Sequence, residues 1–159
     1  MERMEHVITN AAKYFLGGVW RRRRELNATL EAIATVRSSL YGAGTDYSKD
    51  RVEGGIKTDL SDKLNRLQKL REQADRETDA LIKMRDAADR LIEHLEDKDQ
   101  RRVLRLRYVY EMPWPAVADT IHVTLRWAFK IHGRALAVLN TTCYEEIKED
   151  IAVHFKHEI

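Results

Sequence analysis

A regular apolar seam over residues 60–95 constrains the fold of this chain more than any other feature. Its positions alternate four and three residues apart, the spacing of a helix that packs along another helix. They are Leu60, Leu64, Leu67, Arg71, Ala74, Thr78, Leu81, Arg85, Ala88, Ile92 and Leu95. The polar side chains in the seam weaken packing but can set register and partner number. The pattern predicts one long helix, capped by Asp59 or Ser61, that needs a partner helix.

The nearest candidate partner is an earlier helix over residues 19–40, which has a similar spacing of apolar and small residues. Gly17-Gly18 precedes it, and glycine is unfavourable inside a helix, so we expect a kink or a helix start there. A glycine-rich connector over residues 41–59, with a short turn around residues 50–52, would let the two helices fold back as an antiparallel hairpin. The alternative partner is the same helix of a second subunit. Because the second helix is the longer one, part of its seam stays uncovered, which predicts a homo-oligomer.

The composition fits an all-α protein. Of 159 residues, 43% are hydrophobic, 34% are charged and only two are proline. No run reaches the roughly 18 apolar residues that span a bilayer, and the N-terminus lacks the apolar core of a secretory signal. The single cysteine, Cys143, cannot form an internal disulfide. We therefore expect no membrane association and a cytoplasmic location.

Residues 101–139 have the pattern of a helix-turn-helix. A first helix is predicted over residues 103–110, ending before Pro113, and a second over 113–121 with Trp114, Val117, Ala118 and Ile121 on its buried face. A break at residues 122–124 follows, and Thr124 can cap a third helix that runs to about residue 139. In such motifs the last helix enters the DNA major groove.

The charge distribution favours the same interpretation. Residues 101–140 hold seven Lys and Arg against two Asp and Glu, whereas residues 60–100 hold nine against eleven and residues 141–159 two against five. A basic segment that coincides with a groove-reading motif is typical of a nucleic-acid binder. We therefore predict a helical oligomerisation region at 1–96, a helix-turn-helix domain at 97–140 and an amphipathic helix in the tail at 141–159.

The third predicted helix divides into two faces. Ala128, Ile131, Ala135 and Leu136 should point inward, while Leu125, Arg126, Trp127, Phe129 and Lys130 should point outward. Arg126 and Lys130 lie where recognition helices meet base edges, and Thr124 can bind a phosphate. The two aromatic residues could instead belong to the core. The expected DNA contacts are Thr124, Arg126, Trp127, Lys130, Arg134, Arg101, Arg102 and Arg105.

Other residues offer little chemistry. The run Arg21–Arg24 could bind phosphates or act as a localisation signal, but a solvated helix turn paired with acidic residues is the simpler interpretation. His154, His157 and Cys143 could share a metal, although we expect no metal and no cofactor. Because the chain lacks a phosphate-binding glycine loop, a nucleophile elbow and a paired-cysteine box, we expect no enzyme activity.

The segment that begins at Arg107-Tyr108 resembles the C-terminal domain of the RinA/ArpU-type phage transcriptional regulators, which is similar to the helix-turn-helix of bacterial sigma factors. Its matching features are Arg107-Tyr108, Trp114 with Val117-Ala118, Thr124 and His132-Gly133-Arg134-Ala135-Leu136. Upstream, Ala12-Lys13-Tyr14, the arginines before Glu25-Leu26, Asp50-Arg51-Val52 and Asp62-Lys63 are similar to the family's N-terminal region. The family tends to have glycine in the turn where this chain has His122, which tolerates a left-handed backbone better than most residues.

The resemblance implies a phage or prophage regulator of late genes that binds promoter DNA in the bacterial host cytoplasm. Double-stranded DNA and a second copy of the chain are the expected partners, and host RNA polymerase is a candidate protein partner. Two alternatives remain open. One is a packaging protein such as a small terminase subunit, and the other is a protein-interaction module that does not bind DNA.

Overall fold

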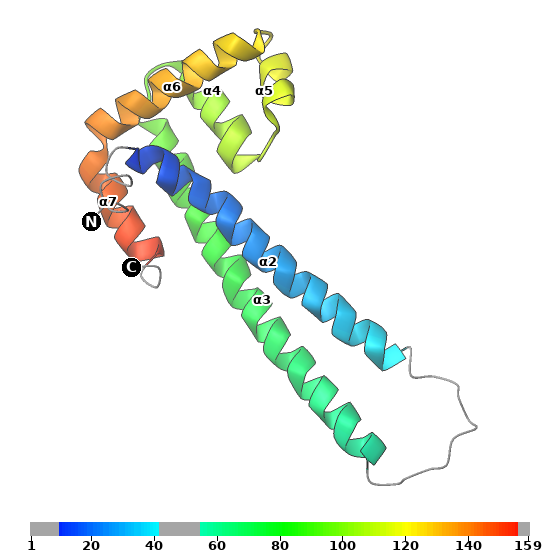
Figure 1. Ribbon diagram of the computed structural model, residues 1–159. Coiled ribbons are helices and arrows are strands. Elements are labelled where there is room, and N and C mark those ends of the chain that lie inside the picture. Colours follow the sequence, from blue (N-terminus) through cyan, green and yellow to red (C-terminus); the bar gives the residue numbers. More distant parts are fainter. Residues whose placement is uncertain (1–9, 42–54, 156–159) are drawn as a thin grey trace. The chain divides into compact units, whose positions relative to one another are not determined.

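The computed structural model describes residues 10–41 and 55–155, and this part of the chain contains helices and no strands. Figure 1 labels the α-helices, which are α2 (Ala11–Tyr41), α3 (Gly55–Glu93), α4 (Lys98–Leu104), α5 (Trp114–Thr120), α6 (Leu125–Thr142) and α7 (Tyr144–His154). Directly after α4 comes a short π-helix, η1 (Arg105–Val109). The prediction of an all-α protein is confirmed. The chain divides into two compact units, residues 1–22 with 80–159 and residues 23–79.

The unit of residues 23–79 is an antiparallel pair formed by the later part of α2 and the earlier part of α3, as predicted (Figure 1). Leu67 and Ala74 of the predicted seam are buried, as are Thr29 and Val36 of α2. The amide Nε2 of Gln73 donates a hydrogen bond to Thr29 Oγ1 at 3.3 Å, which satisfies the one polar side chain among these buried residues.

The start of α3 differs from the prediction. The helix begins at Gly55, several residues before the expected caps at Asp59 or Ser61. Glycine is tolerated at this end because the first amide groups of a helix have no intrahelical partner to lose. Leu60 and Leu64, the first two seam residues, are 49% and 50% exposed. Part of the apolar seam therefore stays uncovered, while the turn expected at residues 50–52 lies outside the described residues.

The other unit combines the start of α2, the end of α3 and all later helices. Here α2 passes through Gly17-Gly18 without a break, so the helix start expected at these glycines was wrong. Packing explains the glycine: a Cβ at Gly18 would lie 2.3 Å from Phe155 Cζ and 2.5 Å from Met84 Cε. Close approach of neighbouring side chains outweighs the low helix propensity of the residue.

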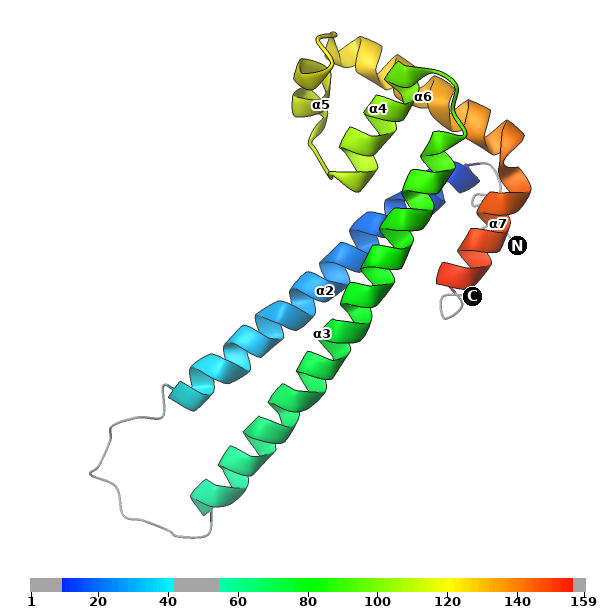
Figure 2. The same cartoon turned by 180° about the vertical axis from the view of Figure 1, so that it is seen from behind.

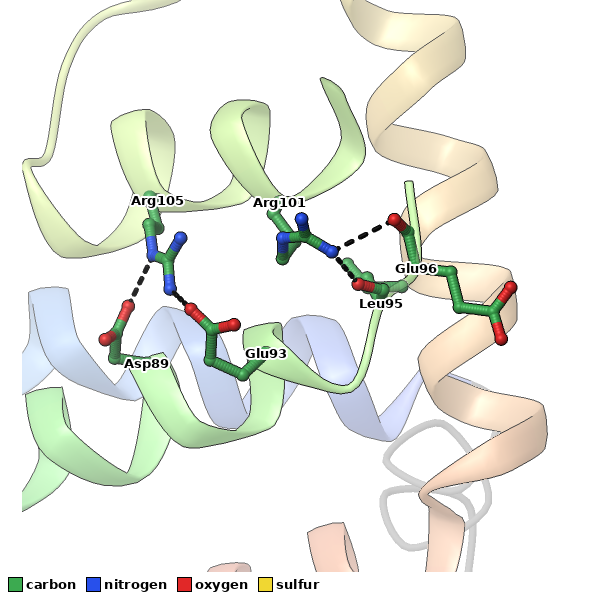
Figure 3. A network of polar contacts seen from close by, with 6 residues as sticks. All are labelled: Asp89, Glu93, Leu95, Glu96, Arg101 and Arg105. Carbon is green, nitrogen blue, oxygen red and sulfur yellow. Dashed lines mark hydrogen bonds and ion pairs between the residues drawn. The ribbon is translucent and has the colours of Figure 1, made fainter. Parts of the chain in front are cut away.

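The end of α3 belongs to the core of this unit. Leu91, Ile92 and Leu95 are fully buried or nearly so. The guanidinium of Arg101 donates to the carbonyls of Leu95 and Glu96, and Arg105 forms ion pairs with Asp89 and Glu93 (Figure 3). The compact units therefore do not follow the boundary expected between residues 96 and 97, because side chains on both sides of it share contacts.

The acidic tail forms α7, which packs against the start of α2 (Figure 2). The Phe155 ring lies 5.5 Å from the ring of Tyr14, and the guanidinium of Arg21 lies over both rings at 4.8 Å and 4.3 Å. Arg22 donates to the carbonyl of His154. Two arginines of the Arg21–Arg24 run thus hold α7 through aromatic rings and a carbonyl. None of the described helices is long and apolar enough to cross a membrane.

The two adjacent glycines of α2 provide a matched test of this packing. Alanine gains about 1 kcal/mol of helix propensity over glycine at either position. A Cβ at Gly17 meets only Arg21 Nη1, at 3.9 Å, whereas a Cβ at Gly18 clashes. We expect Gly18→Ala to be less stable than Gly17→Ala by about 1–3 kcal/mol, the usual cost of overpacking. Equal free energies of unfolding in urea denaturation would contradict the close approach.

Candidate nucleic-acid interface

A small apolar core holds the helix-turn-helix together. Val103 of α4, Val117 of α5 and Ile131 of α6 are buried against one another. Leu106, Met112, Trp114 and Ile121 pack around them and stay partly exposed. The three helices that Figure 1 labels α4, α5 and α6 are therefore fixed to one another by side chains that the periodic pattern predicted.

The segment before α5 is less regular than predicted. The expected helix over residues 103–110 is instead α4, which begins behind the N-cap Asp97, followed by the π-helix η1. Glu111 then adopts a left-handed backbone with φ of 58°. Arg85 and Arg107 donate to the carbonyls of Val109 and Met112, at 3.2 Å and 2.9 Å. The Val109 carbonyl has no helical donor in the chain, because Pro113, four residues on, lacks an N–H, and Arg85 donates to this carbonyl instead. Apolar spacing alone does not reveal this change.

The turn between α5 and α6 agrees with the sequence prediction. His122 adopts a left-handed backbone with φ of 58°, as expected from the resemblance, which aligns His122 with a residue that tends to be glycine in those regulators. The Val123 amide donates to the Ala118 carbonyl at 3.0 Å and closes the turn. Thr124 caps α6, because its hydroxyl oxygen accepts from the Trp127 amide at 3.2 Å. The start of α6 is therefore fixed by the turn.

One face of α6 carries the predicted contact residues. Arg126, Lys130 and Arg134 are exposed and follow one another at intervals of four residues. The Trp127 ring is 43% exposed, with Lys130 Nζ 5.6 Å and Arg134 Cζ 5.5 Å from its centre. Such cation–π contacts hold long side chains near an aromatic face. The arrangement is a basic strip built around one tryptophan.

The inward face of α6 is confirmed. Ala128, Ile131, Ala135 and Leu136 are buried as predicted, and Leu139 joins them one turn later. The alternative that Trp127 and Phe129 belong to the core is wrong, since both rings remain more than 40% exposed. Phe129 nevertheless packs edge-on against Trp114, with ring centres 4.7 Å apart. It therefore closes the rim of the core beside the basic strip.

A polar pair inside this unit, which sequence reasoning did not single out, connects α6 to η1. The hydroxyl of Tyr108 lies 2.9 Å from Nε2 of His132, and the ring of His132 also packs edge-on against Trp114 at 4.9 Å. Burial raises the pKa of Tyr108 to about 12. Burial, with the nearby charges of Lys13 and Arg107, lowers the pKa of His132 to about 4. Both groups are neutral near pH 7, so the phenol can donate to the imidazole.

Arg107 completes the surroundings of this pair. Its guanidinium lies 4.0 Å from the Trp20 ring centre and 5.0 Å from that of Trp114, and burial lowers its pKa. The resemblance in the sequence included Arg107-Tyr108 and His132 but gave no reason for them. Their contacts supply one, because they set the position of α6 in its own unit.

The three arginines expected to clamp the DNA backbone have intrachain partners. Arg101 and Arg105 bind the end of α3 as described above, and both are partly buried. Arg102 is exposed and donates to the Thr120 carbonyl at the end of α5, at 3.1 Å. The main role of Arg101 and Arg105 is therefore to stabilise their own unit. The charged groups of Arg102 and of the α6 strip are exposed at the surface.

Among the metal ligands considered in the sequence, Cys143 and His154 lie at opposite ends of α7. His154 packs near Phe15, with ring centres 6.1 Å apart, and His157 lies outside the described residues. Cys143 instead lies near His94 and Glu146. Sequence spacing could not indicate this group, because His94 is far from the other two along the chain.

In a comparison with known proteins, residues 43–140 match one protein family, whose description is 'protein of unknown function (DUF1492)'. The match extends through α3 to near the end of α6, more than half of the chain. No curated protein and no solved structure matches the chain significantly.

The buried imidazole predicts a specific pH dependence. The pKa of His132 is about 4 in the folded chain and 6.5 for the free group. As the pH falls, the imidazole therefore takes up a proton in the unfolded chain before it does so in the folded chain. Stability from a neutral His132 is therefore complete above pH 6.5 and lost as the pH falls toward 4. His132→Gln stays neutral throughout. We expect the gap in unfolding free energy between wild type and variant to narrow by roughly 2 kcal/mol over this range, after allowing for partial solvent screening.

Denaturation with urea at a series of pH values measures this gap. The lowered pKa of His154 acts in the same direction but is present in both proteins and cancels in the difference. Parallel curves for the two proteins would contradict a buried neutral imidazole at residue 132.

Proposed function

The chain belongs to the DUF1492 family, and we propose that this member is a sequence-specific regulator of transcription that binds double-stranded DNA through α6. One observation carries the proposal: α6 is the last helix of a helix-turn-helix and presents Arg126, Lys130 and Arg134 along one exposed face. A major groove about 12 Å wide admits such a helix with its side chains.

The residues of α6 suit different parts of the duplex. Arg126 is in the first turn, where recognition helices meet base edges, and arginine can bind the two acceptors of guanine together. Lys130 follows one turn later, and Arg134 is far enough along to reach a phosphate. Thr124 and the first amides of α6 offer a second phosphate contact, and Arg102 a third at the end of α5.

Trp127 contributes by organising the basic strip. Its exposed ring holds the side chains of Lys130 and Arg134 near the same face of α6, which lowers the entropy that they lose on binding. The ring also adds an apolar surface that suits a thymine methyl group. Arg101 and Arg105 act indirectly in this scheme, because they hold the unit that presents the strip.

The finer assignment rests on the resemblance to the RinA/ArpU-type regulators. We propose that the protein controls late genes of a phage or prophage, in the cytoplasm of the bacterial host and without enzyme activity. A sigma-factor-like helix-turn-helix makes host RNA polymerase a second candidate partner. The left-handed His122 turn and the Thr124 cap support this assignment, since they preserve the turn at the position where the family has glycine.

The uncovered seam of α3 favours action in more than one copy. Leu60 and Leu64 are about half exposed, and Leu30 of α2 is 48% exposed. Two apolar residues one turn apart on a long helix match the contact surface of a second helix. We propose that this surface joins copies of the chain, which would double the number of bases that the protein reads.

The readout proposal is tested by selecting a binding site from random duplexes with the full chain. Arg126→Ala should weaken binding to the selected site by about 1–3 kcal/mol and affect random DNA much less. Arg134→Ala should weaken binding to the selected site and to random DNA by the same factor. It should also reduce the slope of log affinity against log salt concentration by about one unit. Affinities from fluorescence anisotropy at several salt concentrations measure both effects.

Arg66→Ala is the matched control, since Arg66 is an exposed arginine in the other compact unit. If Arg126→Ala weakened binding to the selected site and to random DNA equally, Arg126 would not read the base sequence. If the wild-type chain bound no DNA even at low salt, a protein-interaction module would replace the regulator.

The oligomer proposal is tested by changing Leu60 and Leu64 together to lysine. Burying each leucine contributes about 1.5–3 kcal/mol, so the double variant should weaken association at least tenfold. Light scattering should show the wild-type chain as a small multiple of 18.6 kDa and the variant shifted toward the monomer. Val153→Lys, a change at a 62% exposed residue of α7, is the control. A closed ring of many copies would favour the packaging protein, and a wild-type monomer would contradict the proposal.

A further inference from the structure

Three potential metal ligands of different chemistry meet where α3 ends and α7 begins. They are His94, Cys143 and Glu146, and one ligand atom of each lies within 4.8 Å of the others. Nε2 of His94 is 3.0 Å from Oε2 of Glu146. Cys143 and Glu146 are three residues apart and so share one side of the first turn of α7. The group is built from two elements and does not depend on one short motif.

We propose that these residues form a zinc site. Zinc is bound by thiolate, imidazole and carboxylate ligands at about 2.0–2.3 Å, so ligand atoms around one ion lie roughly 3–4 Å apart. The spacing observed for the three atoms needs only small side-chain rotations to reach that geometry. Three protein ligands leave one of four tetrahedral positions for water. The inference is independent of DNA binding and goes beyond it.

The surroundings of the three groups suit a cation. A pocket of about 400 Å³ is lined by both His94 and Cys143, so these two ligand residues border the same space. Glu96 and Asp97 also line the pocket and make it attractive to a cation.

The simpler role for two of these groups is an ion pair between His94 and Glu146. Both side chains are more than 40% exposed, and such a surface pair contributes little to stability. It also gives no role to the sulfur. A bound ion would use all three groups and release the Cys143 proton to solvent. The ion would fasten the start of α7 to the end of α3 within one unit.

Titration of the full chain with Zn²⁺ and Co²⁺, after treatment with a chelator, tests the site. We expect one equivalent of metal per chain, a near-ultraviolet band from cobalt bound to thiolate, and a higher Tm with zinc. Cys143→Ser should abolish the band. His94→Ala should lower zinc affinity at least about 100-fold, because loss of even an outer contact to a metal ligand costs 10–100-fold.

Two controls separate the site from nearby groups. Glu145→Gln changes the exposed neighbour of Glu146, which pairs with Lys148, and should bind zinc like the wild type. His154→Gln, at the far end of α7, should also leave the zinc affinity unchanged, which excludes this histidine as a ligand. His94 is exposed, so His94→Ala keeps the test valid even if Cys143→Ser unfolds. Equal zinc affinity in wild type and His94→Ala, or cobalt bound without a thiolate band, would overturn the proposal.

Discussion

The hydrogen bond between Tyr108 and His132 is the interaction on which the presentation of α6 depends. It joins the middle of α6 to the irregular η1 segment, inside a cluster of aromatic rings that includes Trp114. A buried polar pair of this kind is costly unless both partners are satisfied, so it favours one position of the helix over others. The basic strip faces outward because the opposite side of α6 is held in this way.

The arginines of the basic segment serve two purposes. Arg101, Arg105 and Arg107 bind carbonyls, carboxylates or aromatic rings of their own unit. Arg126, Lys130 and Arg134 lie on the exposed face of α6. Net charge alone cannot separate the two groups, because a guanidinium counts equally whether it closes a helix end or faces solvent. The division concentrates the charge available to a partner on one helix and gives the proposed DNA contact its direction.

The long seam of α3 also has two uses. Its later residues, among them Ile92 and Leu95, belong to the core of the unit that contains α6, whereas Leu67 and Ala74 pack in the helix pair. Removal of the chain before residue 97 would therefore take away part of the core of the helix-turn-helix unit and the carboxylates that pair with Arg105. Changes in side chains, which leave this core intact, are the sounder way to separate the proposed DNA binding from the proposed association.

Periodicity and turn chemistry in the sequence determined the all-α class, the buried face of α6 and the Thr124 cap, because each depends on residues close in the chain. The left-handed turn at His122 was expected from the family resemblance. The tertiary structure alone decided the features that depend on distant neighbours. Gly18 lies inside a helix because Phe155 and Met84 fill the space of its side chain. The last carbonyl of the π-helix, that of Val109, accepts a hydrogen bond from Arg85 of α3. Cys143 lies beside His94 rather than His154, since folding, and not spacing, brings α3 to α7.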